Sequence, residues 1–107
     1  MKIKDINSER ILFDNGSTIT FCYCRVCFEN NYADFEQLEE SALTYDFDED
    51  LVFDAVDGVG FRFGNEDGMM FFVPCYSEQN GYYSSDVEIN YNGKQVIELK
   101  CEKVIVY

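Results

Sequence analysis

Two Asn-Gly pairs, Asn15-Gly16 and Asn92-Gly93, constrain the fold of this chain more than any other sequence feature. Asn-Gly is the strongest short-range signal of a β-hairpin, because both positions of the tightest hairpin turn need positive φ angles. Apolar and polar residues alternate on both sides of each pair, as in half-buried strands. The flanking stretches are ERILFD and STITF for the first pair, and DVEINY and KQVIEL for the second. The pattern predicts two antiparallel hairpins.

A third hairpin is expected from Val59–Phe63 and Met69–Val73. The loop between them contains Asn65 and Asp67-Gly68, which are residues typical of turns. The preceding stretch, residues 50–56 (DLVFDAV), fits either a short helix or a strand, and its pattern leaves both readings open.

One amphipathic helix is expected over Tyr32–Leu43 (YADFEQLEESAL). Phe35, Leu38 and Ala42 fall at helical spacing, and Asn31 is a suitable N-cap. Together these elements predict an α+β fold. It is a single domain over residues 1–107, with an antiparallel sheet of five to seven strands built from hairpins and the helix packed on one face.

Charge and composition exclude several kinds of function. The chain has 8 Lys and Arg against 21 Asp and Glu, a net charge of -13, so nucleic acid and anionic membranes should repel it. It has no histidine, which excludes Ser-His-Asp triads, Cys-His dyads and His-ligated zinc. No nucleophile-base pair or P-loop is visible, so we expect no enzymatic activity and no cofactor.

The sequence also carries a prediction about location. The longest purely apolar run, Met69–Val73, is far shorter than the ~20 residues that a membrane-spanning helix needs. The first eight residues, MKIKDINS, do not resemble a secretory signal. We therefore expect a cytoplasmic protein.

The acidic residues are concentrated in the middle of the chain. Residues 26–61 contain 11 acids in 36 residues and no Lys or Arg, whereas the other 71 residues have 10 acids and 8 bases. Such clustering exceeds what solubility requires, because closely spaced like charges destabilise a fold. These acids are Glu29, Asp34, Glu36, Glu39, Glu40, Asp46, Asp48, Glu49, Asp50, Asp54 and Asp57.

The expected elements would arrange these acids in rows. Glu36 and Glu40 lie one turn apart on the predicted helix, about 6 Å. On a strand, Asp46, Asp48 and Asp50 share a face at about 6.6 Å intervals. Nucleic acid phosphates form a comparable ladder of single charges, one per ~3.4 Å along each strand. The rows therefore predict a surface that binds a basic protein groove, and the alternative is a solvated acidic face without a partner.

The same segment has part of the spacing of a calcium-binding EF-hand loop. Counted from Asp46, acids occupy positions 1, 3, 5 and 12. Position 6, which must be glycine for the sharp turn, is Leu51, and position 12 is Asp57 instead of the longer glutamate. We therefore expect no EF-hand and no specific metal site here, and the alternative is weak, adventitious binding of divalent cations.

The five cysteines are Cys22, Cys24, Cys27, Cys75 and Cys101. An odd number without a secretory signal indicates reduced thiols. On a regular strand Cys24 and Cys27 point to opposite faces, so we expect structural cysteines and no bound metal. The alternative is a zinc site in the FCYCRVCF segment, where C-x-C and C-x-x-C occur together.

Residues 76–85 (YSEQNGYYSS) have the composition of a binding loop. Tyr76, Tyr82 and Tyr83 are the candidate anchors for a partner. The alternative is a long hairpin loop whose tyrosines lie against the edge of the sheet.

Several segments resemble a family of small uncharacterised proteins of bacteriophages and their bacterial hosts. They are ILFDNGSTIT (11–20), YADFEQLEE (32–40), DEDLVFDAVDGVGFRFGN (48–65) and FFVPCYSEQNGYYSSDVEINYNGK (71–94). The resemblance implies a phage context and a location in the host cell. It carries no established activity.

Together these features predict a counter-defence inhibitor that mimics nucleic acid and blocks a basic groove of a host nuclease or CRISPR effector. The alternative is an accessory or structural domain of a phage or mobile element without enzymatic activity. The oligomeric state stays open.

Overall fold

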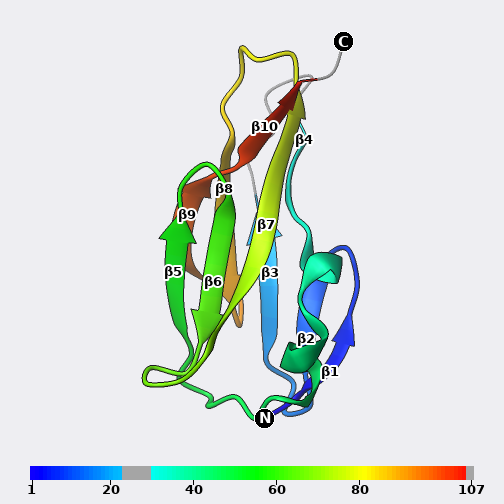
Figure 1. The fold of residues 1–107 in the computed structure, drawn as a ribbon, viewed down its shortest axis with the longest axis vertical. Coiled ribbons are helices and arrows are strands. Elements are labelled where there is room, and N and C mark those ends of the chain that lie inside the picture. The colour runs from blue at the N-terminus through cyan, green and yellow to red at the C-terminus, as the bar shows by residue number, and fades with distance from the viewer. Residues whose placement is uncertain (23–29, 106–107) are drawn as a thin grey trace.

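The computed structural model describes residues 1–22 and 30–105 and arranges them mainly in two sheets that face each other (Figure 1). The first sheet has the strand order β1-β2-β3-β8-β9 and is antiparallel throughout. The second has the order β10-β7-β6-β5, and β4 also pairs with β7. The strands are β1 (Ile3–Ile6), β2 (Arg10–Phe13), β3 (Thr18–Cys22), β4 (Asn30–Ala33), β5 (Val52–Val56), β6 (Gly60–Gly64), β7 (Met70–Gln79), β8 (Asp86–Tyr91), β9 (Lys94–Lys100) and β10 (Glu102–Ile105).

All three predicted hairpins are confirmed, as β2–β3, β6–β7 and β8–β9. The two Asn-Gly turns differ, however. Asn92 and Gly93 both have positive φ, 52° and 81°, as a two-residue turn requires. In the first turn only Gly16 does, at 91°, and its N–H donates to the Phe13 carbonyl. The expectation of two positive φ angles is wrong there, because the Asn15 side chain supports a wider turn by accepting the Ser17 N–H.

The helix expected over Tyr32–Leu43 is wrong, and with it the α+β fold class. Residues 1–22 and 30–105 contain no α-helix, only the short 3₁₀ helices η1 (Phe35–Gln37) and η2 (Glu40–Thr44). Leu38 and Glu39 between them are extended, with ψ of 136° and 147°.

The physical reason is competition from the second sheet. Asn31 is not a helix cap: it belongs to β4, which pairs with residues 75–78 of β7. Phe35 and Ala42 do reach the core, as their apolar spacing suggested. Strand pairing of β4 satisfies backbone groups of β7 that a helix at this position would leave unpaired.

Residues 52–56 of the ambiguous segment form β5, which pairs with β6. Residues 76–79 of the predicted loop belong to β7, so Tyr76 is a strand residue and only residues 80–85 connect β7 to β8. β7 is the longest strand and pairs with β6 over residues 70–74. Beyond that point β4 and β10 pair with it, and β10 runs parallel to it.

The core lies between the two sheets and is rich in phenylalanine. On β6, Phe61 and Phe63 are buried and Arg62 between them is exposed, which is the alternation of a strand with one solvated face. On β8, Val87 and Ile89 contribute from the opposite sheet. The resulting molecule is elongated, 41 × 22 × 22 Å, so its two ends are separate surfaces.

Candidate functional site

Two loops form one end of the molecule. The connection from η2 to β5 runs along the end that carries the N-terminus, beside the β6–β7 loop (Figure 1). Asn65 joins the two loops: its Nδ2 donates to the Asp46 carbonyl at 3.2 Å, and its Oδ1 accepts the Asp48 N–H at 2.6 Å. The Tyr45 hydroxyl accepts the Met69 N–H at 3.2 Å. The two loops therefore form one continuous surface.

Phe47 fixes this surface from the inside. Its side chain is buried, and its ring packs within 5.6 Å of the ring centroids of Phe13, Phe63 and Phe71. Its backbone N–H donates to the Met1 carbonyl, and its own carbonyl accepts from the Met1 α-amino group, both at 2.7 Å. The loop is irregular in backbone and yet firmly attached to the core.

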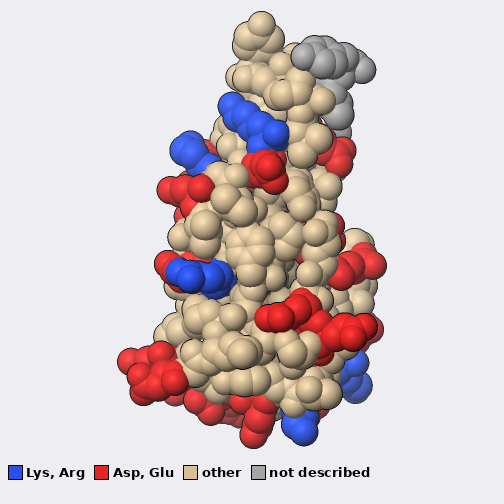
Figure 2. Space-filling view, viewed as in Figure 1, with Lys and Arg blue, Asp and Glu red and all other residues tan. Residues whose placement is uncertain are grey.

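Six exposed carboxylates lie on this surface, which we call the acidic end. Four were predicted, and Glu66 and Asp67 were missed because Arg62 ends the base-free segment before them. The members are Asp46, Asp48, Glu49, Asp50, Glu66 and Asp67. On the face that Figure 2 shows, red side chains outnumber blue ones along this end.

The carboxylates of the acidic end have few partners. Within residues 1–22 and 30–105, one ion pair involves them, between the Met1 α-amino group and Asp46 at 3.1 Å. Glu49 accepts a hydrogen bond from Asn15 Nδ2 at 3.3 Å. A shallow cavity of about 320 Å³ is lined by Asp48, Asn65, Glu66, Asp67 and Gly68. The surface is therefore strongly negative and open to solvent.

The expected row of Asp46, Asp48 and Asp50 on a strand is wrong. Residues 46–50 are irregular, because the hydrogen bonds to Asn65 and Met1 replace strand pairing. Residues 52–56, which lie inside the EF-hand spacing counted from Asp46, form strand β5.

A second set of predicted acids lies on the side of the molecule that carries η1 and η2. Glu36, Glu39 and Glu40 are exposed there, but Glu36 and Glu40 belong to different 3₁₀ helices and not to one helical turn. Glu36 and Glu40 line one cavity of about 310 Å³, together with Ile6, Leu38 and Leu43.

Asp34 and Tyr76, which were predicted from separate motifs, meet on the same side. Gln37 Nε2 donates to Asp34 at 2.7 Å and to the Tyr76 hydroxyl at 3.3 Å. The Tyr76 ring lies 5.8 Å from that of Tyr32, whose hydroxyl donates to Glu78 at 3.1 Å. Burial and this carboxylate raise the pKa of Tyr32 to about 12.

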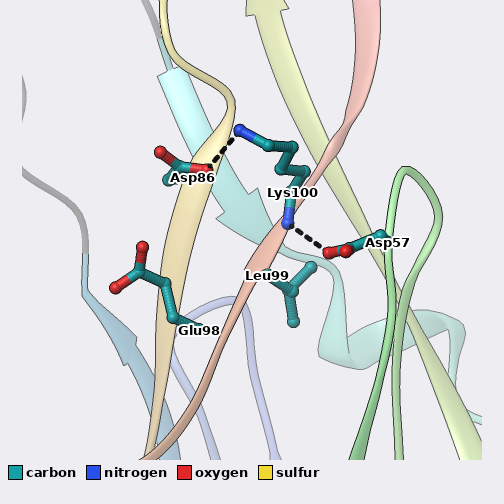
Figure 3. Close-up of a pocket in the computed structure, with 5 residues that line it drawn as sticks. All are labelled: Asp57, Asp86, Glu98, Leu99 and Lys100. Atoms are coloured by element: carbon teal, nitrogen blue, oxygen red, sulfur yellow. Dashed lines mark hydrogen bonds and ion pairs between the residues drawn. The ribbon is translucent and has the colours of Figure 1, made fainter.

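Asp54 and Asp57 lie on neither of these surfaces. Asp54 on β5 pairs with Arg62 on β6. Asp57 accepts the Lys100 backbone N–H at 3.2 Å and lines a polar cavity of about 260 Å³ (Figure 3). There the Lys100 ammonium pairs with Asp86 at 3.2 Å, and hydrogen bonds from Ser84 and Lys100 lower the pKa of Asp86.

Tyr82 and Tyr83 lie far from the acidic end. Their loop, residues 80–85, is at the opposite tip (Figure 1). Tyr82 is 88% exposed. Gln79, which is buried, accepts the Tyr83 N–H at 2.8 Å and donates to Ser77 at 2.6 Å and to the Ser84 carbonyl at 3.3 Å. The tyrosine loop is thus anchored but does not adjoin the carboxylates.

Glu29, Cys24 and Cys27 lie outside the described residues. Of the other cysteines, Cys22 is exposed, Cys75 and Cys101 are buried, and all three are free thiols. A hydrogen bond to Cys101 and burial raise the pKa of Cys75, which disfavours a reactive thiolate.

The chain matches no family model, no curated protein and no solved structure. The resemblance to phage proteins therefore stays a prediction. In the described part of the chain, no helix has the length and apolar character needed to cross a membrane.

Proposed function

We propose that this protein is a non-catalytic inhibitor that docks its acidic end onto a basic groove of a nucleic-acid-binding protein. The observation that carries this proposal is the gathering of six carboxylates from two loops at one end, where among the described residues a single ion pair, between Met1 and Asp46, involves them. A nucleic acid strand presents single negative charges at ~3.4 Å intervals. Exposed carboxylates on a surface that is anchored to the core present single negative charges to a basic groove, as phosphates do.

The attachment of the acidic end favours binding. Phe47 in the core and the hydrogen bonds of Asn65 hold both loops before any partner arrives. A surface that is already ordered loses less conformational entropy on association than a flexible acidic tail would. The clustered charge also accelerates encounter with a basic partner and makes association dependent on salt.

The proposed partner is a host defence protein, either a nuclease or a CRISPR effector, and the proposed location is the host cytoplasm. This context rests on the predicted resemblance of four segments to phage proteins. The contact we propose excludes Tyr82 and Tyr83, which lie at the other tip. It requires no cofactor and no direct binding of nucleic acid.

Charge reversal at the acidic end tests the proposal. The triple variant Asp48→Lys, Asp50→Lys, Asp67→Lys changes exposed side chains, so the fold should persist. Wild-type protein on a resin is expected to capture a nucleic-acid-binding protein from host lysate at low salt. Once that partner is purified, wild type should displace labelled DNA from it. The triple variant should do neither.

A matched control keeps the overall charge equal. Glu9→Lys, Glu98→Lys, Glu102→Lys alters three exposed acids away from the acidic end and makes the same change in net charge. This control should still displace DNA, and raising salt from about 0.05 to about 0.5 M should weaken the wild-type effect. Equal displacement by both triple variants would contradict the proposal.

The second candidate is an accessory or structural domain without mimicry. It is favoured by the distribution of the other predicted acids, since Asp54 is paired with Arg62 and Asp57 with the backbone of Lys100. Failure of the wild-type protein to displace DNA from any captured protein would support this candidate instead.

A further inference from the structure

The cavity between β1 and the two 3₁₀ helices is an apolar groove with a charged rim. Ile6 from β1, Leu38 from the extended link and Leu43 from η2 form its apolar part. Its volume is about 310 Å³. Leu43 is 46% exposed, so the chain itself does not cover this groove completely.

Two carboxylates complete the rim. Glu36 comes from η1 and Glu40 from the start of η2, and both are exposed. Among residues 1–22 and 30–105, neither takes part in an ion pair or a hydrogen bond with another side chain. Negative charge beside exposed apolar surface defines the chemistry of a complementary group, which must carry a cation on an apolar stem.

We infer that this groove receives an arginine side chain of the partner protein. The aliphatic stem of arginine would lie on Leu38 and Leu43, as long cationic side chains commonly cover apolar surface. The guanidinium would reach Glu36 and Glu40, and its planar fork suits carboxylates better than a lysine ammonium does. The inference rests on the proposed function, because it names one group of the basic partner.

Two small cations can distinguish specific binding in this groove from nonspecific attraction of cations to an acidic protein. n-Butylguanidinium carries the arginine head group on an apolar stem, whereas guanidinium is the head group alone. NMR titration should show saturable shifts of the methyl groups of Ile6, Leu38 and Leu43 with n-butylguanidinium. Its affinity should exceed that of guanidinium about threefold or more, because the stem buries apolar surface.

Variants test the contributions of the carboxylates and of the apolar side chains of the groove separately. Glu36→Gln with Glu40→Gln keeps side-chain size and should weaken n-butylguanidinium binding about fivefold. Leu43→Ser, at an exposed position, should reduce the preference for the butyl compound. The control Asp48→Asn with Asp67→Asn alters the acidic end and should leave the groove affinity unchanged.

The outcomes separate this inference from the proposed function. Equal affinity for both cations, or saturable shifts confined to the acidic end, would overturn the groove as an arginine site. DNA displacement that Glu36→Gln with Glu40→Gln does not weaken at all would also overturn it and leave the acidic end as the working surface. Loss of displacement only in the acidic-end variant would therefore count against the groove alone.

Discussion

Asn31 shows how one buried polar side chain can hold three segments together. Its Nδ2 donates to the carbonyls of Ser84 and Asp86, and its Oδ1 accepts from the Ser77 hydroxyl. Asn31 and Ser77 are both almost fully buried. A network of this kind specifies one arrangement of β4, β7 and the tyrosine loop, because any other arrangement would leave the buried Asn31 side chain without its hydrogen-bond partners.

Asn31→Leu is expected to lower the free energy of unfolding by about 2–4 kcal/mol, since it removes three hydrogen bonds at a buried site, and Gln79 still donates to Ser77 and to the Ser84 carbonyl. Urea denaturation measures this change. Gln95→Ala, at an exposed position on β9, is the control and should change stability by less than about 0.5 kcal/mol. A similar small loss in Asn31→Leu would show that the network does not hold the three segments.

Tyr32 is expected to make stability depend on alkaline pH. Its pKa is raised from 10.0 to about 12 by burial first and then by Glu78. Below pH 10 the phenol is protonated in both states, so its contribution is fully present. Between pH 10 and 12 the unfolded chain ionises first, and the free energy of unfolding falls.

Tyr32→Phe should flatten this alkaline decline in a series of urea denaturations at rising pH. In tyrosine ¹³Cζ NMR, Glu78→Gln should lower the pKa of Tyr32 but keep it above 10, because the effect of burial remains. A pKa unmoved by Glu78→Gln would contradict the role given to the carboxylate.

The segment from β4 to η2 shows how an apolar stripe can occur without a helix. Phe35 and Ala42 are buried at helical spacing, but Leu38 and Glu39 between them are extended and separate two short 3₁₀ helices. The start of the segment joins the second sheet as β4. The rest forms the two 3₁₀ helices, which place Phe35 and Ala42 in the core. Tertiary pairing overrides local helix propensity here.

Proline substitution distinguishes the observed link from a continuous helix. Glu39 has φ -64° and ψ 147°, and Leu38 before it is extended, so both already have the conformations that Glu39→Pro requires. We expect Glu39→Pro to change the free energy of unfolding by less than about 1 kcal/mol. Inside a helix the same change would cost about 3 kcal/mol.

Gln37→Pro is the matched control. It removes the N–H that donates to the Asp34 carbonyl at 3.2 Å and should lower stability by about 1 kcal/mol or more. Thermal unfolding of both variants checks the pair. A severe loss in Glu39→Pro would favour a helix through this segment.

Charge is distributed unevenly along the whole molecule. The acidic end and the tyrosine loop lie at opposite ends of a body 41 Å long, well beyond the ~10 Å Debye length at 0.1 M salt. The six carboxylates of the acidic end lie close together, and the ion pair between Met1 and Asp46 relieves their mutual repulsion only in part. This repulsion is a stability cost that a binding surface would recover on meeting a basic partner.

Neutralising part of the acidic end should stabilise the free protein. Asp48→Asn, Asp50→Asn, Asp67→Asn is expected to raise Tm by roughly 3–5 °C at about 0.01 M salt. The gain should shrink as salt increases. Glu9→Gln, Glu98→Gln, Glu102→Gln makes the same change in net charge and should gain less, because these acids lie apart from the cluster. Equal gains at low salt would contradict local repulsion at the acidic end.

The sequence by itself determined the three hairpins and the reach of Phe35 and Ala42 into the core. Hairpins depend on turn residues and on alternation over neighbouring residues, and both are local properties. It also placed four of the six acidic-end carboxylates in one segment. The base-free segment ends before Arg62, so Glu66 and Asp67 were not included in the predicted surface, although a turn was predicted at Asn65 and Asp67-Gly68.

Only the tertiary structure decided which distant segments meet. The parallel pairing of β10 with β7, the choice of strand for Asn31 and the joining of two acidic loops by Asn65 all depend on contacts between residues far apart in the chain. Their free energy comes from burial and hydrogen bonding that exist only after the two sheets pack together. The local sequence pattern does not encode such contacts. For that reason the acids expected in regular rows are found instead on a loop surface and around a separate groove.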